Sequence, residues 1–280
     1  MTPVLKNKLI NGGLYLSYAL IILFFIFPVF WVFSLSLKSV PELFADPPLL
    51  FSKEPVFANY VYVLQNTGIL GNITNSLKLV FLTILFTLMI AIPAAYAFSR
   101  FQFRQKRFSL MAILVFQMIS PVVIGIPLYR FFSELGLLNN HMALIVVLVA
   151  VELPFTTWFL KGYFDTIPYE LDEAAIVDGC TRLQMIWKVL LPVSLPGITS
   201  VSILVAVQSW SQFVIPFILL DQDSLFPVSV GLVKTQASIE AITTHYLAAA
   251  CIVAILPVIA LFVILQRFIV GALTNGAVKG

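Results

Sequence analysis

The residues best suited to chemistry are a few polar side chains that lie within apolar stretches of the sequence. Glu152 is followed one helical turn later by Thr156, and amide side chains occur at Gln117 and Gln208. A carboxyl group at the centre of a membrane helix costs about 3 kcal/mol on insertion scales, so we expect it to face a bundle interior or water. Carboxylates, amides and aromatic faces suit the hydroxyl groups and ring faces of sugars. The candidate solute-path residues are Gln117, Glu152, Thr156, Trp158, Gln208, Ser209, Trp210, Ser211 and Gln212.

These polar groups have alternative explanations. Hydroxyl and amide side chains also hold membrane helices together, and Glu152 suits a subunit interface or a proton site as well as a cavity. The sequence contains no Gly-x4-Gly-Lys-Ser/Thr, His-Glu-x-x-His or Gly-x-Ser-x-Gly pattern. Its two histidines stand alone, and its two cysteines have no metal-ligand spacing. We therefore expect no catalytic residues, no bound metal and no cofactor held by this chain.

Composition places the chain in the membrane class. Hydrophobic residues make up 60% and charged residues 10% of the 280 positions, whereas a soluble domain carries roughly 25% charged residues. The net charge of +3 gives no indication of nucleic-acid binding. A membrane-crossing helix needs about 20 apolar residues, and it must bond its own backbone groups because lipid offers no partners. The predicted fold is all-α, a polytopic membrane protein with six transmembrane helices near 14–37, 75–98, 109–131, 141–162, 198–220 and 247–270.

Positive charge predicts the orientation of these spans, because short loops rich in Lys and Arg stay in the cytoplasm. The loop after the second span holds Arg100, Arg104, Lys106 and Arg107, and basic residues also occur near both termini. Both termini and the long connection before the fifth span are therefore expected in the cytoplasm. The predicted divisions are a cytoplasmic segment 1–13, a transmembrane domain 14–270 with a cytoplasmic loop 163–197 and external loops 38–74 and 221–246, and a cytoplasmic tail 271–280.

The long cytoplasmic loop is predicted to form two helices separated by a turn. Pro168 suits the first turn of a helix, and the acidic residues that follow it favour a helix N-terminus. Gly179 can take the left-handed conformation that ends a helix, and Thr181 can cap the next one. Pro192 and Pro196 should end this second helix before the fifth span. Its apolar stripe is expected to comprise Leu183, Ile186, Trp187 and Leu190.

Part of this loop resembles a known family motif. Glu173-Ala174-Ala175 is followed after three residues by Gly179, and after nine more by Val189-Leu190-Leu191-Pro192. The pattern is similar to the EAA loop, E-A-A-x3-G-x9-I-x-L-P, of binding-protein-dependent ATP-binding-cassette (ABC) permeases, with valine replacing the usual isoleucine. The resemblance implies that the first helix is a coupling helix that docks into a groove on an ATPase subunit. The candidate coupling residues are Leu171, Glu173, Ala174, Ala175, Asp178, Gly179 and Arg182.

The resemblance extends over most of the chain. The segments 27–38, 75–77, 94–100 and 266–280 look like the sugar-uptake branch, in particular the shorter permease subunit of the maltose/trehalose type. Where that branch often reads W-N-E-F, this chain has Trp210-Ser211-Gln212-Phe213. The resemblance therefore implies an ATP-driven sugar importer in the prokaryotic cytoplasmic membrane, and it leaves the particular sugar open.

The resemblance also implies partners. They are a second permease subunit in a heterodimer, two ATPase subunits that bind ATP and Mg, and an extracytoplasmic solute-binding protein. Closure of the ATPases would move the cytoplasmic loop and switch the cavity from inward to outward facing. Two alternatives stay open at this point: a permease of the same family for a non-sugar solute, and an ion-coupled secondary transporter that uses Glu152.

Overall fold

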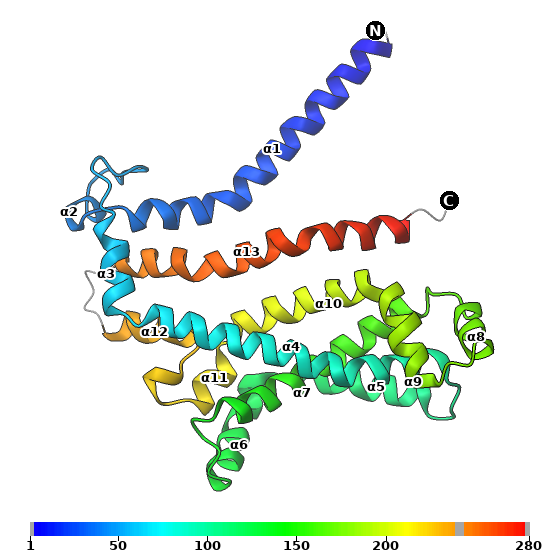
Figure 1. Cartoon of the computed structure of the whole chain (residues 1–280). Coiled ribbons are helices and arrows are strands. Elements are labelled where there is room, and N and C mark those ends of the chain that lie inside the picture. The colour runs from blue at the N-terminus through cyan, green and yellow to red at the C-terminus, as the bar shows by residue number, and fades with distance from the viewer. Residues whose placement is uncertain (1–2, 239–243, 278–280) are drawn as a thin grey trace. The chain divides into compact units, whose positions relative to one another are not determined.

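The computed structural model describes the backbone of residues 3–238 and 244–277, and every regular element in these residues is helical (Figure 1). The all-α fold predicted from the sequence is therefore confirmed. The chain divides into two compact units. One comprises Met1–Ile69 with Leu232–Leu256, and the other comprises Leu70–Gly231 with Pro257–Gly280.

Helices extend into both predicted terminal segments. α1 (Pro3–Ser36) begins inside segment 1–13, and α13 (Thr244–Ala277) continues into segment 271–280. The described residues leave out 1–2 and 278–280, which belong to the terminal segments, and 239–243, which belong to the second predicted external loop.

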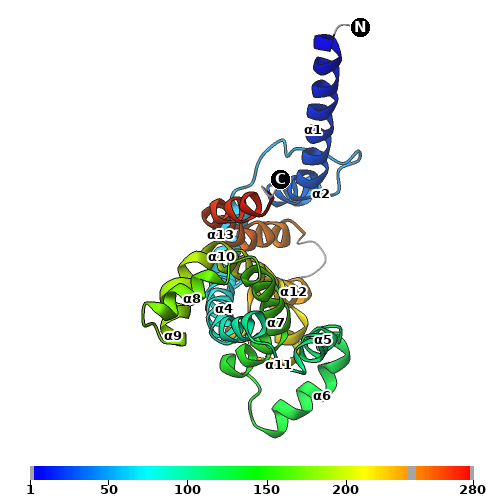
Figure 2. The same cartoon turned by 90° about the vertical axis from the view of Figure 1, so that its right-hand side faces the viewer.

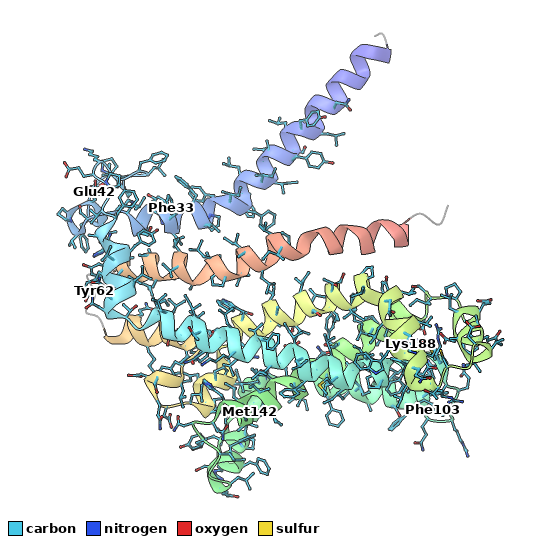
Figure 3. The ribbon with its side chains drawn as sticks, in the orientation of Figure 1. Phe33, Glu42, Tyr62, Phe103, Met142 and Lys188 are labelled. Atoms are coloured by element: carbon cyan, nitrogen blue, oxygen red, sulfur yellow. The ribbon has the colours of Figure 1, made fainter. Side chains whose placement is uncertain are left out.

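In the first unit, the connection that follows α1 is folded. The buried amide of Asn59 donates to the backbone oxygens of Ser36 and Lys38, at 2.9 and 3.1 Å. Glu42, labelled in Figure 3, accepts a hydrogen bond of 2.7 Å from the Ser52 hydroxyl, and this bond lowers the pKa of the Glu42 carboxyl. The first predicted external loop is thus an ordered segment. Its helices are α2 (Val40–Leu43) and α3 (Ala58–Asn66).

The second unit contains the elements that carry the candidate sites. α4, α7 and α10 lie side by side in both views (Figures 1 and 2). In chain order the elements are α4 (Ile69–Arg100), α5 (Lys106–Gln117), α6 (Pro121–Glu134), α7 (His141–Phe164), α8 (Glu170–Val177), α9 (Arg182–Met185), the π-helical turn η1 (Ile186–Leu190), α10 (Leu191–Ser211), α11 (Val214–Leu219) and the 3-10 turn η2 (Asp223–Leu225). α12 (Val228–Ser238) and α13 are each divided between the two units.

Two buried apolar clusters hold the helices of this unit together. The first joins the early part of α7 to α11 and includes Leu144 and Ile215, and the second joins the late part of α7 to α4, α9 and α10 and includes Leu160. α4 and α7 contribute to both clusters in the same order along the chain, so these two helices run parallel. Ala91 and Ala95 of α4 are fully buried, as expected for small residues that let membrane helices approach closely.

Within the residues that the structure describes, five helices are long and apolar enough to cross a membrane, with a sixth if α5 and α6 count as one broken span. The third predicted span is therefore not a straight helix, because α5 and α6 are bent by 87°. Pro121 supplies no backbone donor. The preceding Ser120 has extended backbone angles, and its hydroxyl caps α6 by accepting a 3.3 Å bond from Val122 N.

The fifth predicted span also differs from the expectation. Pro192 and Pro196 do not end the second cytoplasmic helix, because α9, η1 and α10 form one continuous helical stretch that ends at Ser211. In η1 the backbone N–H of Leu191 bonds to the carbonyl oxygen of Ile186, five residues back. A π turn redirects hydrogen bonds where the ladder is disturbed, so the helix passes through Pro192 without a break.

A close contact fixes α10 against α7. A Cβ atom placed on Gly197 of α10 would lie 2.5 Å from Cγ of Tyr163 on α7, well inside van der Waals contact. Glycine is therefore required at this point, where the Tyr163 ring lies against the helix backbone. The early part of α10 contacts the late part of α7, so the two helices are antiparallel.

Gly197→Ala is expected to lower the free energy of unfolding of the detergent-solubilised permease by about 1–3 kcal/mol, the usual cost of overpacking. Thermal unfolding followed by circular dichroism measures the loss. Gly162→Ala on α7 is the control, because a Cβ there meets nothing within 4 Å and alanine favours a helix by about 1 kcal/mol over glycine. Equal stability of the two variants would contradict the packing described here.

Candidate functional site

α8 and the turn that ends it form a compact elbow. Figure 3 places Phe103 and Lys188 at the end of the second unit that carries α8, well away from Met142. Gly179 has φ +82°, the left-handed conformation predicted for it. Gly179 N bonds to the carbonyl oxygen two residues before the helix cap, and Cys180 N bonds to Ala175 O, both at 3.0 Å. This pair of bonds is a Schellman motif, which satisfies the last carbonyls of the helix.

α8 has two different faces. Asp172 and Ala175 are buried against their own chain, at 3% and 5% exposure. Glu173, Ala174 and Asp178 are exposed. Both alanines of the motif were predicted to be coupling residues, but only Ala174 is open to a partner. Ala175 instead packs into the second apolar cluster, because it lies one turn from Asp172 on the inward side. The other predicted coupling residues on the exposed surface are Leu171, Gly179 and Arg182.

A buried ion pair connects α8 to the end of α4. Arg100 Nε lies 2.6 Å from Asp172 Oδ2, and the two side chains are 7% and 4% exposed. The contact is electrostatic rather than an aligned hydrogen bond. Arg100 Nη2 also donates to Ile167 O at 3.1 Å, and its guanidinium lies 5.5 Å from the centroid of the Tyr169 ring.

Sequence reasoning missed this pair. Arg100 was counted only as a cytoplasmic charge, and Asp172 only as an acidic residue favourable at a helix N-terminus. The sequence did contain a signal for this pair. Arg100 stands at the end of the second apolar segment, and Asp172 lies three residues before Ala175, on the same face of the helix. Periodicity alone did not bring these distant segments together.

The segment after α8 is also tied to the end of α4. The Arg182 guanidinium lies 4.9 Å from the centroid of the Phe101 ring, in cation–π contact. Thr181 caps α9 as predicted, and it exchanges two hydrogen bonds with Gln184, in which Gln184 N donates to the hydroxyl at 3.3 Å and Thr181 N donates to the amide oxygen at 2.9 Å. This box fixes the start of α9 immediately after the turn at Gly179.

The apolar stripe predicted for the second cytoplasmic helix is not observed as one face. Ile186 and Leu190 are buried, but Leu183 and Trp187 are 70% and 69% exposed, and Met185 is fully buried instead. The prediction assumed 3.6 residues per turn throughout. The π turn η1 contains wider turns, so the positions that face inward shift around the helix axis.

The predicted solute-path residues separate into two groups. Glu152, Thr156 and Ser209 are buried inside their own unit, at 4%, 0% and 8% exposure. Trp210 and Gln212 are half-buried. A path shared with a second subunit must be lined by residues that are open on one subunit alone. The exposed members of the predicted set are Gln117, Trp158, Gln208 and Ser211.

The buried group is short of hydrogen-bond partners. Among the described residues, the hydroxyls of Thr83, Thr87, Thr156 and Ser209 have none. The carboxyl group of Glu152 has neither a hydrogen bond nor an ion pair in the described part of the chain. On α10, by contrast, Thr199, Ser200 and Ser202 each bond to the carbonyl four residues back.

Two contacts set the depth of this buried group. Gln208 follows Gly197 by as many residues as Glu152 precedes Tyr163. Because α10 and α7 are antiparallel and touch at Gly197 and Tyr163, Gln208 and Glu152 lie at the same depth. α4 runs parallel to α7, and a 2.7 Å hydrogen bond joins Ser99 to Asp165. Counting back equally far along both helices from this bond places Thr83 and Thr87 just above and below the depth of Glu152. The polar residues of three helices therefore share one depth and form a polar layer.

Two helix breaks lie near this layer. α5 has 12 residues, about 18 Å of helix at ~1.5 Å per residue, which is short of the ~30 Å hydrocarbon core. It ends at Gln117, and α10 ends at Ser211. The helices after the two breaks, α6 and α11, pack together, and a Cβ on Gly125 would lie 2.7 Å from Ile218 Cδ1. Broken helices at membrane depth are tolerated where they line a cavity or are covered by protein.

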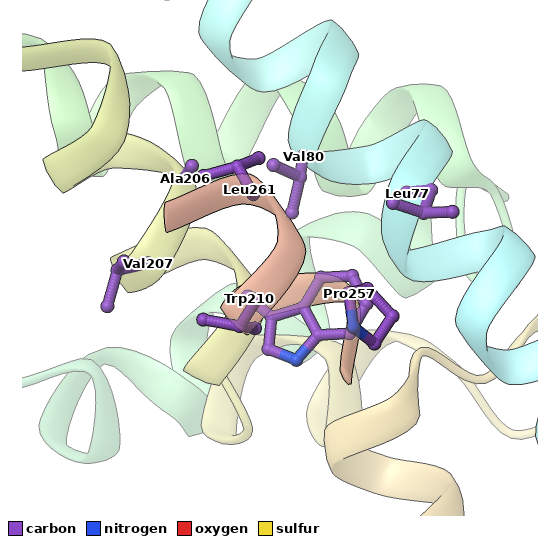
Figure 4. Close-up of a pocket in the computed structure, with 8 residues that line it drawn as sticks. Leu77, Val80, Ala206, Val207, Trp210, Pro257 and Leu261 are labelled. Atoms are coloured by element: carbon purple, nitrogen blue, oxygen red, sulfur yellow. The ribbon is translucent and has the colours of Figure 1, made fainter. Parts of the chain in front are cut away.

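Trp210 lies in different surroundings from its exposed neighbours. It lines an apolar cavity of about 20 Å³, where its indole lies beside Pro257 (Figure 4). A cavity of this size has room for one water molecule, but a water needs polar partners, and the lining is otherwise aliphatic. The cavity does not suit a polyhydroxylated solute. Its other lining residues are Leu77, Val80, Ala206, Val207, Val258 and Leu261.

No group of three His, Cys, Asp or Glu side chains with metal-site geometry occurs among the residues that the structure describes. Cys180 and Cys251 are both free thiols. The expectation that this chain holds no metal or cofactor stays a prediction.

The apolar spans and the polar helix breaks together define a polytopic membrane protein. The chain belongs to the family described as binding-protein-dependent transport system inner membrane components, whose profile matches residues 84–275. It is thus the permease of a binding-protein-dependent ABC importer, a multi-pass inner-membrane protein that is not itself an enzyme.

Several related proteins align with this chain over nearly its whole length. The sulfoquinovosyl glycerol transport permease SmoH of Agrobacterium fabrum is 32% identical over 91% of this chain and 89% of its own length. The permease YcjP of Escherichia coli is 31% identical over 98% and 99%. The trehalose/maltose transport permease MalG of Thermococcus litoralis is 30% identical over 91% and 92%.

Solved structures show the same fold. A chain of a bacterial ABC transporter for alginate import aligns with a TM-score of 0.79 at 22% identity, over 94% of this chain and 97% of that one. A chain of the methionine transporter MetNI aligns with a TM-score of 0.58 at 18% identity, over 73% and 95%. At these identities the likeness concerns the fold alone.

Gly179→Ala is expected to loosen the end of α8, because an L-residue with a side chain pays about 1–2 kcal/mol in the left-handed region. Hydrogen exchange at the Cys180 amide, which bonds to Ala175 O, should speed up about tenfold. Gly179→Asn is the matched variant, because asparagine tolerates this conformation better than alanine. Equal exchange in all three proteins would show that the turn does not depend on glycine.

Proposed function

We propose that this permease imports a sugar, in the range from a monosaccharide to a small oligosaccharide or glycoside, that is delivered by an extracytoplasmic binding protein. Two of the relatives above are described as carriers of trehalose and maltose or of a sulfoquinovosyl glycerol. A third, AraQ of Halalkalibacterium halodurans, is described as part of an arabinooligosaccharide system. The exposed amides at the two helix breaks supply the donors and acceptors that sugar hydroxyls need.

The proposed complex contains this chain, a second permease subunit in a heterodimer, two ATPase subunits and the binding protein. ATP and Mg are then held by the ATPase subunits and not by this chain. The alginate transporter of the same fold has been described in complex with a pentasaccharide-bound periplasmic protein. The distribution of Lys and Arg supports a cytoplasmic position for both termini and for α8.

α8 is the proposed coupling helix, and one observation carries this proposal: its acidic side chains are divided between two opposite faces. Asp172 is buried on an arginine of the same chain, whereas Glu173 and Asp178 are free for a partner. Closure of the ATPases would carry the exposed face with it. The buried face would then pass the displacement to the transmembrane helices.

The proposed solute path follows the exposed side of α10 and the two helix breaks. Leu204, Val207, Gln208 and Ser211 recur at helical spacing and are all exposed, so they form one open stripe that becomes polar toward the break. Gln117 ends α5 in the same way. Glu152 and Thr156 are assigned to the interior of the subunit, behind this stripe.

The unpaired carboxyl group of Glu152 is the observation that favours the alternative, an ion-coupled transporter. The two mechanisms separate in proteoliposomes. Uptake that needs internal ATP and survives a protonophore supports the importer. Uptake that continues without ATPase subunits and stops with the protonophore supports the ion-coupled mechanism.

The sugar class is tested on the cognate binding protein. Calorimetric titration with a panel of mono- and disaccharides should give micromolar or tighter binding for at least one sugar. A parallel panel of amino acids and short peptides is the control. Binding only in the second panel would overturn the sugar proposal while leaving the permease assignment intact.

Glu173→Lys is expected to lower binding-protein-stimulated ATP hydrolysis and transport at least about tenfold. A charge reversal at a docking surface readily costs ~1.4 kcal/mol or more, because it places like or unpaired charges against the partner. Hydrolysis and uptake are measured on the purified complex in proteoliposomes. Glu134→Lys is the control, an equal charge change at an exposed residue at the end of α6. Equal effects of the two changes would remove the coupling role from Glu173.

Gln208→Leu is expected to slow uptake about three- to tenfold, the loss of one hydrogen bond worth ~0.5–1.5 kcal/mol. The neighbouring Ser209→Ala should leave uptake unchanged, because the Ser209 side chain is buried and has no partner among the described residues. Initial uptake of radiolabelled sugar is the measurement. A larger effect of the serine change would place the path inside the subunit.

A further inference from the structure

The inner end of α4 contacts the chain on both sides of α8. Before α8, Ser99 Oγ donates to Asp165 Oδ1 at 2.7 Å, and Arg100 Nη2 donates to Ile167 O at 3.1 Å. After α8, the Arg182 guanidinium lies 4.9 Å over the aromatic ring that follows Arg100. Adjacent residues at one helix end therefore hold the segment that enters α8 and the segment that leaves it.

The ion pair between Arg100 and Asp172 closes this contact from within α8 itself. Both side chains are more than nine-tenths buried. A charge in such a place is tolerated only with its partner, so removal of either one leaves the other buried and uncompensated. The pair thus strongly disfavours any movement of α8 away from α4.

The position of α4 makes this attachment relevant to transport. α4 has 32 residues, about 48 Å of helix at ~1.5 Å per residue. It runs from the contact with α8 to the depth of the polar layer, where it carries Thr83 and Thr87. A second route exists, because α9 continues through η1 into α10. The covalent route through α10 contains a π turn, whereas α4 is α-helical throughout, with Pro93 inside it.

We propose that Arg100 and Asp172 are positioning residues that make α8 and α4 move as one body, so that the motion of the ATPases enters the bundle through α4. The inference rests on the coupling role proposed for α8. Neither side chain touches the ATPase or the solute in this proposal. Their part is to keep α8 from sliding over the bundle when it is pulled.

The test is the number of solute molecules moved per ATP hydrolysed by the reconstituted complex with its binding protein. Asp172→Asn and Arg100→Gln should each lower this ratio about fivefold or more, a coupling within the range found for residues in contact. The double variant pairs two neutral amides and leaves no buried charge, so the ratio should return to within about twofold of the wild type. A purely structural role would reduce transport and hydrolysis in parallel and leave the ratio unchanged, which would overturn the proposal.

Lys161→Gln is the matched control, because Lys161 forms the neighbouring pair with Asp165 at 2.5 Å, with side chains 25% and 39% exposed. It should leave the ratio unchanged, since an exposed pair contributes little. If either neutral single variant fails to assemble, Arg100→Lys replaces it. Lysine keeps the positive charge but lacks the forked guanidinium group that reaches Ile167 O. An intermediate ratio of solute moved to ATP hydrolysed is therefore expected. A wild-type ratio would overturn the proposal.

Failure of this inference is distinguishable from failure of the coupling role itself. If Glu173→Lys leaves stimulated hydrolysis intact, α8 is not the docking helix. If Glu173→Lys abolishes stimulated hydrolysis while the Arg100 and Asp172 variants keep a normal ratio, α8 is the docking helix and its motion enters the bundle by another route.

Discussion

Lipid offers no hydrogen bonds to a polypeptide backbone, and this constraint decides where the helices of the permease can be interrupted. Each interruption satisfies its own groups. Ser120 caps α6 after the break at Pro121, and the carbonyl of Gln212 accepts a 2.7 Å bond from the Ser229 hydroxyl where α10 has ended. The π turn redirects the ladder to Ile186 O. At Pro121 and after Ser211, breaks in the helices therefore occur together with polar side chains that bond to backbone groups.

The same constraint explains how much of the fold could be predicted from the sequence. The apolar runs, and the length that a helix needs to cross the membrane, were enough to place five spans. Gly179 and Thr181 were enough to place the turn in the elbow. Pro121 and Pro192 show the limit. Pro121 lies within a span predicted as one helix, but it coincides with an 87° bend, whereas Pro192 was expected to end a helix and lies in an unbroken one. The difference depends on which neighbouring groups replace the missing bond, and that is settled by packing.

The candidate sites show a similar limit. Sequence pattern found the exposed acids of α8, because they sit in a motif of fixed spacing. It could not separate Gln208 from Ser209, and it gave Asp172, beside Glu173, no contact with another helix, although each pair is adjacent in the chain. Neighbouring helical residues point about 100° apart, so one faces a partner while the other faces the core. Only knowledge of the neighbouring helices tells which is which, and the ion pair of Asp172 depended on a helix that ends 72 residues earlier, at Arg100.

The π turn between α9 and α10 has a consequence for the geometry of the elbow. Such a turn holds one residue more than the α-helical ladder needs. If residues 186–190 were wound as a regular α-helix instead, everything on the cytoplasmic side would rotate by about 100° relative to α10. Met185 would leave the core and the Arg182 guanidinium would lose the ring beneath it. The angular setting of α8 and α9 relative to α10 thus depends on one surplus residue that the π turn absorbs.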